Sequence, residues 1–469
     1  MTKLTAQLLG LSLTLLLSTG CAVGPNYKRP SADVPGMYRG STPQEPAPAQ
    51  PAAESLGDQK WWEVFQDKQL QDLIHTALQQ NYDIRIAATR ILEARAQVGI
   101  TRADQLPTLS GGAQAVNERF ADAKLFPHYE TDANQVDLSF AWDLDFWGKY
   151  RRASEAARAN LLATEWARKA VISALVSDVA TAYFQLRSLD LQLEISRRTL
   201  ASRQDSLKLT QTLANGGATS MLDVRQAEQL VDTAAETIPD LERQIEQREN
   251  FLSTLLGNNP GPIARGMKLT EQPHAPDVPA GLPSSLLERR PDIREAEAQL
   301  IAANAQIGVA KAAYFPDISL TGTAGFQSPA LSLFTGPSGM WSLAGSLVQP
   351  IFAGGRIRSG VKYSEARKQE MVLTYQQTIQ QAFRGVSDAL VEYHKDREFR
   401  EYQEQLAFSA QDAAQLSETR YRGGAASYLE VLTNETNYFN AELGLAQAQA
   451  NELVALVEIY HNLGGGWQQ

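Results

Sequence analysis

The sequence contains one long segment twice. Residues 83–110 align without gaps on residues 292–319, and eleven of the twenty-eight aligned positions are identical at a constant offset of 209. Further along the chain the offset is 207, since the Asn-Gly-Gly-Ala at 215–218 corresponds to the Arg-Gly-Gly-Ala at 422–425. A unit of roughly two hundred residues used only twice fits no short-repeat solenoid, whose units are about 20–45 residues long. The duplication therefore predicts a pseudo-symmetric protomer.

Each half contains the pattern of a very long helix. Residues 150–213 hold neither Pro nor Gly, and the second half repeats the pattern over about 356–421. Apolar residues recur at every seventh position, which is typical of a helix that packs along a neighbour in a coiled coil. These residues are Ile172, Val179, Leu186, Leu193, Leu200 and Leu207 in the first half and Val372, Ile379, Val386 and Tyr393 in the second. About sixty residues at ~1.5 Å each extend on the order of 95 Å, far beyond a globular domain.

A pair of glycines follows each long helix and is predicted to reverse the chain. The four residues are Gly216, Gly217, Gly423 and Gly424. A second helix then returns over about 220–256 in the first half and 427–463 in the second. Each half thus predicts a long helical hairpin with a glycine turn at its tip.

Two segments before each long helix have the pattern of strands. The clearest is residues 136–147, in which six large apolar residues alternate with five polar or small ones. Pattern and length suit a strand with one face toward lipid, and an amphipathic strand of a soluble sandwich is the alternative. The predicted strands lie at about 106–120, 135–147, 315–327 and 340–352. Four strands cannot close a barrel, whereas twelve strands from three copies can enclose water, so the pattern predicts a trimer.

The single cysteine, Cys21, follows a segment with the features of a signal peptide. Residues 1–20 carry one positive charge, at Lys3, and an apolar run at 8–17 that is too short to span a bilayer. The Leu-Ser-Thr-Gly before Cys21 resembles a bacterial lipobox, in which the cysteine is lipidated and becomes the mature N-terminus. An ordinary signal peptide with a chance cysteine is the alternative. Ala22, in place of the Asp of an inner-membrane retention signal, favours the outer membrane.

These patterns predict six consecutive parts of the chain. They are a signal peptide at 1–20, a lipidated Pro- and Ala-rich tether at 21–55, a first repeat at 56–257, a linker in an equatorial belt at 258–281, a second repeat at 282–464 and a tail at 465–469. A Pro-rich tether is expected to be extended.

Composition and motifs argue against an enzyme and against nucleic acid as a partner. Lys and Arg total 43 against 53 Asp and Glu, for a net charge of -10, whereas phosphate binding relies on clustered cations. The five histidines, at 75, 128, 274, 394 and 461, have no metal-ligand spacing. Motifs for a nucleophilic serine or a phosphate-binding loop are missing from the sequence. We therefore expect no catalysis, no metal site and no cofactor other than the lipid on Cys21.

At this point the sequence resembles the outer membrane factor family of TolC-like efflux channels, in its lipoprotein or NodT-type branch. The resemblance covers essentially the whole mature chain. The motifs that carry it are CAVGPNYKRP at 21–30, WW at 61–62, LERRPDI at 287–293, YRGG at 421–424, YLEVL at 428–432 and LGGGW at 463–467. It implies an α+β membrane protein: a trimeric twelve-stranded β-barrel in outer-membrane lipid, with four strands per protomer, continued by an α-helical coiled-coil tunnel across the periplasm. It also implies two partners, a periplasmic adaptor and an inner-membrane transporter of the resistance-nodulation-division class.

The resemblance further implies a gate at the periplasmic tips of the hairpins. Acidic rings there favour cations by threefold repetition. Glu430 follows the second turn, and Asp223 occupies the duplicated position. Thr433 stands where relatives often carry a second acidic residue, and Tyr421 matches the tyrosine that helps hold the helices closed. The alternative for both carboxylates is a solvated charge near a helix N-terminus. The glycine turns would also offer a docking surface for the adaptor.

The expected function is a passive outer-membrane conduit for antibiotics and other small toxic compounds. Copper or silver export is an alternative, although the six methionines form no cluster in the sequence. A coiled-coil structural lipoprotein that conducts nothing is an alternative of a different class, which would leave the alternating strands without a purpose.

Overall fold

The computed structural model describes residues 22–39, 55–120, 129–273, 283–329 and 339–468, which fall into two compact units. The signal peptide and Cys21 lie outside the described residues. The described elements are η1 (Leu56–Asp58), α2 (Trp61–Val64), α3 (Lys68–Gln80), α4 (Tyr82–Ala103), β1 (Thr108–Phe120), β2 (Tyr129–Asp143), α5 (Lys149–Asn215), α6 (Met221–Leu255), η2 (Leu269–Glu271), α7 (Pro283–Arg289), α8 (Pro291–Ala312), β3 (Asp317–Ser328), β4 (Gly339–Val348), α9 (Arg356–Arg422) and α10 (Tyr428–Asn462).

The two halves of the chain fold alike, which confirms the predicted duplication. Helices α4 and α8 each contain 22 residues, α5 and α9 each contain 67, and α6 and α10 each contain 35. Helix α8 begins 209 positions after α4, while α9 and α10 begin 207 positions after α5 and α6. The offsets read from the sequence are therefore those of the structure.

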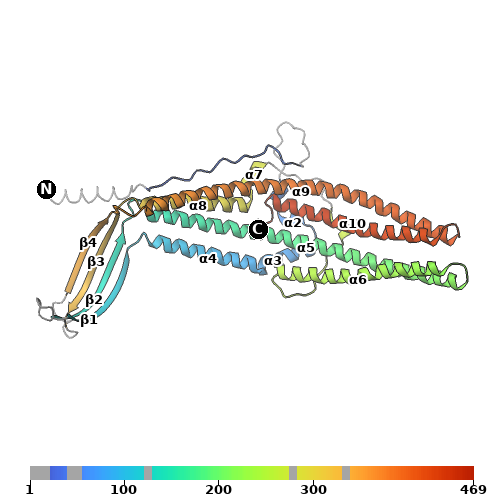
Figure 1. The fold of residues 1–469 in the computed structure, drawn as a ribbon, viewed down its shortest axis with the longest axis horizontal. Helices are drawn as coiled ribbons and strands as arrows, with labels where there is room; N and C mark the ends of the chain where they lie inside the picture. Colours follow the sequence, from blue (N-terminus) through green and yellow to red (C-terminus); the bar gives the residue numbers. More distant parts are fainter. Residues whose placement is uncertain (1–21, 40–54, 121–128, 274–282, 330–338, 469) are drawn as a thin grey trace. The chain divides into compact units, whose positions relative to one another are not determined.

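The first unit holds a four-stranded sheet. This unit comprises the described parts of residues 1–31, 89–165 and 295–376. Its strands are all antiparallel, in the order β1-β2-β3-β4, so the β2–β3 pair joins the two halves of the chain (Figure 1). Large apolar side chains such as Leu138, Leu343 and Trp341 are 56%, 71% and 80% exposed. The sheet thus presents an apolar face that no described part of the chain covers.

Two strands end earlier than the alternating pattern predicts. Strand β2 ends at Asp143 rather than at 147, because Asp145 accepts hydrogen bonds from the backbone N–H of Tyr150 and Arg151 at 3.2 and 2.8 Å, where α5 begins. Strand β4 ends at Val348 rather than at 352, and Pro350, which lacks an N–H, follows. The alternating apolar and polar pattern of the sequence therefore extends past the ends of these two strands into the connections to the helices.

The N-terminal segment, residues 22–31, packs against the helices of the first unit. The N–H of Val23 donates to the Trp147 carbonyl at 3.0 Å, and Arg29 makes two hydrogen bonds of 2.6 Å to the Glu297 carboxylate. A side chain added at Gly148 would place its Cβ 2.8 Å from the Ala22 Cα. This start of the predicted tether is therefore fixed to the fold, with Ala22 against the beginning of α5.

The second unit comprises the described parts of residues 32–88, 166–294 and 377–469. The helical segment between residues 67 and 105 is divided into α3 and α4, because the Asn81 side chain accepts hydrogen bonds from the N–H of Asp83 and Ile84 at 2.8 and 3.2 Å and so begins α4. Asp67, only 1% exposed, accepts from the Tyr183 hydroxyl at 2.8 Å and from the Met267 N–H at 3.0 Å. This buried carboxylate fastens the segment after α6 to helix α5.

Most of the second unit consists of two helical hairpins, α5–α6 and α9–α10 (Figure 1). Ile195 of α5 packs with Phe439 and Ala446 of α10, which joins one hairpin to the other. Among the described residues, no helix combines the length and the apolarity that crossing a bilayer demands.

Candidate functional site

The two glycine turns have the same geometry. Gly217 and Gly424 both have φ of +72°, and a Cβ at either position would contact nothing within 4 Å. The N–H of Ala218 donates to the Leu213 carbonyl at 2.8 Å, and Ala425 repeats this bond at the same length to Arg420. This is a Schellman ending, in which a left-handed residue closes the helix. Backbone conformation, not crowding, therefore requires glycine at the second position of each pair.

Asp223, the first predicted gate carboxylate, caps its own helix. It accepts hydrogen bonds from the Thr219 hydroxyl and from the Ser220 N–H, the latter at 3.2 Å, and its own N–H donates to the Ser220 hydroxyl at 3.3 Å. These bonds, that from Thr219 above all, hold the pKa of Asp223 below its usual value. The Asp223 carboxylate therefore caps the start of α6.

Glu430, at the duplicated position, has a different partner. Its Oε1 lies 3.0 Å from Nη1 of Arg420, across the turn between α9 and α10, and its side chain is 36% exposed. Arg420 also reaches the carbonyl of Ala425 at 3.4 Å. The first turn has Leu213 where the second has Arg420, so this ion pair belongs to the second hairpin alone. Each carboxylate thus already has a partner within its own hairpin.

The other two predicted gate residues lie on the same hairpin as Glu430. Tyr421 stacks at a tilt on Tyr428, with ring centroids 5.3 Å apart, and its buried hydroxyl has no hydrogen-bond partner among the described residues. Thr433 is exposed, and its hydroxyl donates to the Leu429 carbonyl at 2.9 Å. The structure therefore groups Tyr421 and Glu430 at the second turn and gives Thr433 no ionic role.

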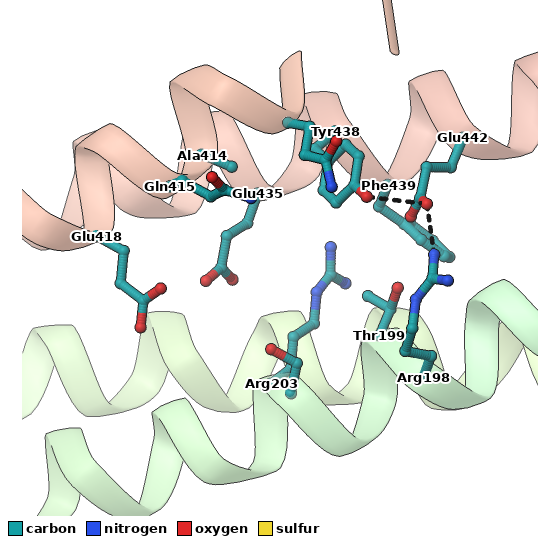
Figure 2. A pocket seen from close by; sticks show the side chains of 12 residues that line it. Arg198, Thr199, Arg203, Ala414, Gln415, Glu418, Glu435, Tyr438, Phe439 and Glu442 are labelled. Atoms are coloured by element: carbon teal, nitrogen blue, oxygen red, sulfur yellow. Dashed lines mark hydrogen bonds and ion pairs between the residues drawn. The ribbon is translucent and has the colours of Figure 1, made fainter. Parts of the chain in front are cut away.

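A cavity lined mostly by polar residues lies between α5, α9 and α10, and sequence reasoning missed it. Its volume is about 230 Å³, and Figure 2 shows Arg203 of α5 and Glu435 of α10 pointing into it from opposite sides. Arg203 is 2% exposed, donates through Nη1 to the Leu230 carbonyl at 2.8 Å, and stacks over Phe439 at 5.0 Å. Its other two guanidinium nitrogens have no partner within the described part of the chain.

Burial dominates the electrostatics of this cavity. It lowers the pKa of Arg203 and raises the pKa of Glu435, although the Arg203 charge works against the second shift. At its rim Arg198 pairs with Glu442, whose carboxylate also accepts from the Tyr438 hydroxyl at 2.9 Å. Polar contacts therefore join the two hairpins here, beside the apolar contact of Ile195 with Phe439.

One signal in the sequence marks this cavity. Arg203 stands three residues after Leu200, at a heptad position that a coiled coil reserves for an apolar side chain. Of the equivalent earlier residues, Leu175 and Ala182 are apolar and buried, and Ser196 is buried and polar but uncharged. A charged residue at a core position is the pattern that could have drawn attention to this place.

The fold and the two turns define a class of protein. A sheet with an apolar exposed face and two glycine-turn hairpins, each with a 67-residue helix, match the architecture of one protomer of an outer-membrane channel. The crystal structure of CusC superposes with a TM-score of 0.86 at 34% identity and covers 95% of this chain and 100% of its own. The outer-membrane channel OprN gives 0.88 at 30% identity, with 96% and 100% covered.

The chain belongs to the outer membrane efflux protein family, which matches residues 73–258 and again 282–465, one match in each half. Three relatives are similar over nearly their whole length. They are the probable efflux pump outer membrane protein TtgC of Pseudomonas putida (37% identical; 99% of this chain, 97% of the relative), the cation efflux system protein CusC of Escherichia coli (37%; 97% and 97%) and the probable outer membrane lipoprotein SilC of Salmonella typhimurium (36%; 98% and 99%).

Three predictions from the sequence are confirmed by these relatives. The resemblance to the outer membrane factor family is real. The fold class is that of a trimeric barrel continued by a helical tunnel, with one four-stranded sheet in each protomer. The protein is an outer-membrane channel component of an efflux pump.

Proposed function

We propose that three copies of this chain form a passive conduit that expels antibiotics and other small toxic compounds. In this proposal the trimer joins a periplasmic adaptor and an inner-membrane transporter of the resistance-nodulation-division class, and the chain itself catalyses no reaction. The single observation that carries the trimer is the open sheet: β1 and β4 lie at its two ends, and neither pairs on its outer edge with another described strand. Three such sheets, joined edge to edge, satisfy those backbone groups in lipid.

Relatives of this chain support the choice of cargo. Proteins named for toluene efflux and for antibiotic efflux, both of Pseudomonas putida, match 99% of this chain at 37% identity. A deletion strain complemented with the wild-type gene tests the cargo against dyes, antibiotics, toluene, copper and silver. We expect sensitisation to several unrelated organic compounds, reversed by complementation. Sensitisation to copper and silver alone would contradict the proposal.

Metal export is the second candidate, and one observation favours it. The cation efflux system protein CusC is also 37% identical, over 97% of this chain. The same susceptibility profile separates the two cargoes, because metal export predicts unchanged tolerance of organic compounds.

We also propose that Cys21 carries the lipid and that the glycine turns dock the adaptor. Ala22, the residue after Cys21, lies against Gly148, next to the strand-to-helix connection. A lipid on Cys21 would therefore enter the membrane beside the sheet. Mass spectrometry of the purified chain tests the lipid, since an unmodified Cys21 in the mature protein would contradict it.

We propose that Glu430 sets the cation preference of the channel tip and that Arg420 restrains it. Because the two side chains are ion-paired at 3.0 Å, removing the Glu430 carboxylate and removing the Arg420 guanidinium should change cation block in opposite directions. Glu430→Ala should weaken block of the single-channel current by multivalent cations, whereas Arg420→Ala, which frees the carboxylate, should strengthen it. Asp223→Ala added to Glu430→Ala should weaken block further, since a second acidic ring is lost.

A matched control is Glu398→Ala on α9. Glu398 is an exposed carboxylate paired with Lys395 at 2.6 Å, within the helix and outside the turn. Its removal should leave cation block unchanged. If the Asp223→Ala/Glu430→Ala channel has the wild-type conductance and the wild-type block, neither carboxylate belongs to the gate.

A further inference from the structure

The start of α9 presents unpaired cations close to exposed apolar side chains. Ile351 and Phe352, just after β4, are 98% and 91% exposed. Arg358 and Lys362 are exposed as well, and neither forms an ion pair with a residue that the structure describes. A neighbouring cation of the same unit differs in this respect, because Lys311 forms an ion pair of 3.1 Å with Glu365.

Arg358 and Lys362 share one face of α9. They are four residues apart, so their side chains lie one turn above the other, about 5–6 Å apart at the Cβ atoms. Glu365, three residues further on, continues this face and is held by Lys311 of α8. The acidic side chain nearest along the face therefore already has a partner, and the two cations keep their charge for another group.

Two observations place this face at the boundary of the bilayer. The ladder between β3 and β4 ends at the pair Asp317–Val348, and α9 begins only eight residues after Val348. At the same end of the sheet, Ala22 lies against Gly148 at the start of α5. This second observation rests on the proposed lipidation of Cys21, whose acyl chains would enter the periplasmic leaflet of the outer membrane at that level.

We infer that Arg358 and Lys362 bind the phosphate of an anionic phospholipid in the periplasmic leaflet, with Ile351 and Phe352 against its acyl chains. A guanidinium and an ammonium group both donate charge-assisted hydrogen bonds to phosphate. Cations next to a membrane-spanning element attract anionic lipid, each contributing appreciably to the affinity. The order along the chain, with the apolar pair nearer to the sheet and the cations beyond it, is the order of acyl chains and headgroups in a leaflet.

The experiment counts lipids on the purified full-length protein by native mass spectrometry. The delipidated protein in detergent is titrated with phosphatidylglycerol or, as the zwitterionic comparison, phosphatidylcholine. The wild type should bind phosphatidylglycerol more tightly, and added salt should weaken this binding. The double variant R358Q/K362Q should lose about tenfold to thirtyfold in affinity for phosphatidylglycerol, since two charges are removed.

Two further variants keep the test decisive. R358K retains the charge and should retain most of the binding, and R384Q/K395Q removes two exposed cations of the same helix that pair with Asp388 and Glu398, so it should bind as the wild type does. Equal binding of phosphatidylglycerol by R358Q/K362Q and the wild type would overturn the inference, as would equal binding of the two lipids by the wild type. Dissociation of the R358Q/K362Q oligomer would overturn it too, by assigning the cations to an interface between copies.

Failure of this inference can be told apart from failure of the proposed function. Ion conductance is measured on the same samples in a neutral bilayer, where R358Q/K362Q should conduct as the wild type does. Loss of lipid binding with intact conductance would be consistent with the channel function. Absence of conductance in the wild type would contradict the channel function without changing the number of lipids bound.

Discussion

At the scale of single residues, the glycines of each turn divide into two kinds. Gly217 and Gly424 adopt a left-handed backbone, whereas a Cβ at Gly216 or Gly423 would make only ordinary contacts of 3.5 Å with a carbonyl oxygen. The sequence shows four equivalent glycines, and only the hydrogen bonds of the turn distinguish them. One glycine of each pair is therefore open to substitution.

This division can be tested at the first turn. Gly217→Ala should destabilise the turn by about 1 kcal/mol, because an L-residue is strained at positive φ, and the Ala218 amide should then exchange hydrogen roughly fivefold faster. Gly216→Ala is the matched control and should change exchange by less than about twofold. Hydrogen exchange followed by mass spectrometry measures both variants. Equal acceleration in the two would show that the positive φ is not what the turn requires.

The two predicted gate carboxylates show how much can be learned by comparing the two halves of the sequence. Their duplicated positions, Asp223 and Glu430, are evident from the offset of 207. Their different roles depend on neighbours outside the repeat pattern: Thr219 and Ser220 hold the first, and Arg420 holds the second. Such contacts are set by the turn geometry, so pattern reasoning found the residues and missed their partners.

At the scale of elements, two hairpins meet at a polar contact around Arg203 and Glu435. Leaving one of two buried opposite charges alone costs more than removing both. Arg203→Met should therefore destabilise the α5–α10 contact, and adding Glu435→Gln should recover about 1 kcal/mol of that loss. Hydrogen exchange along α10 in the single and double variants measures this coupling. Strictly additive effects of the two substitutions would show that the residues do not interact across the cavity.

The same pair gives the contact a pH dependence of known sign. The folded-state pKa of Glu435 is raised by burial, so the folded state favours the protonated form. The contribution of Glu435 to the protection of α10 should be complete below the usual glutamate pKa of about 4.3 and should be lost as the pH rises through the higher folded-state pKa. Glu435→Gln should flatten this dependence, and a wild-type profile in that variant would assign the dependence to another group.

The N-terminal segment makes a second contact between elements, with Glu297 of α8. Glu297 receives both hydrogen bonds of Arg29 and a third, of 3.1 Å, from the Tyr27 hydroxyl. Glu297→Gln should destabilise the contact of the N-terminal segment with α8 by about 1 kcal/mol, a modest cost because Arg29 is partly exposed. Trypsin should then cut after Lys28 about fivefold faster. Glu288→Gln, which removes an exposed partner of Arg294, is the control and should leave the cutting rate unchanged. An equal rate of cleavage in Glu297→Gln and the wild type would show that Glu297 does not hold the segment.

Much of the element order follows from the sequence, and the exceptions have physical reasons. The duplication and the 67-residue helices follow from the constant offset, the heptads and the lack of Pro and Gly. The break between α3 and α4 is not evident from the helical pattern, because Asn81 caps a helix within a pattern that continues through it. The cavity at Arg203 was missed because heptad reasoning followed Leu200 and its apolar equivalents and passed over the polar position beside them.

At the scale of the whole molecule, the chain is one part of a larger closed structure. A single protomer leaves the outer edges of β1 and β4 unpaired by any described strand, and its sheet exposes Trp341 and Leu343. Exposed apolar faces and open edges of this kind are stable only when lipid and neighbouring copies cover them. The relatives establish the class of channel. Conduction by this chain requires that its copies enclose a water-filled pore.

The measurement that tests this claim most directly is the ion current of the purified full-length protein in a planar lipid bilayer, with its oligomeric mass determined on the same sample. We expect a trimer that inserts in discrete steps of equal conductance. A folded trimer that carries no current would contradict it and would favour a coiled-coil lipoprotein with a structural role.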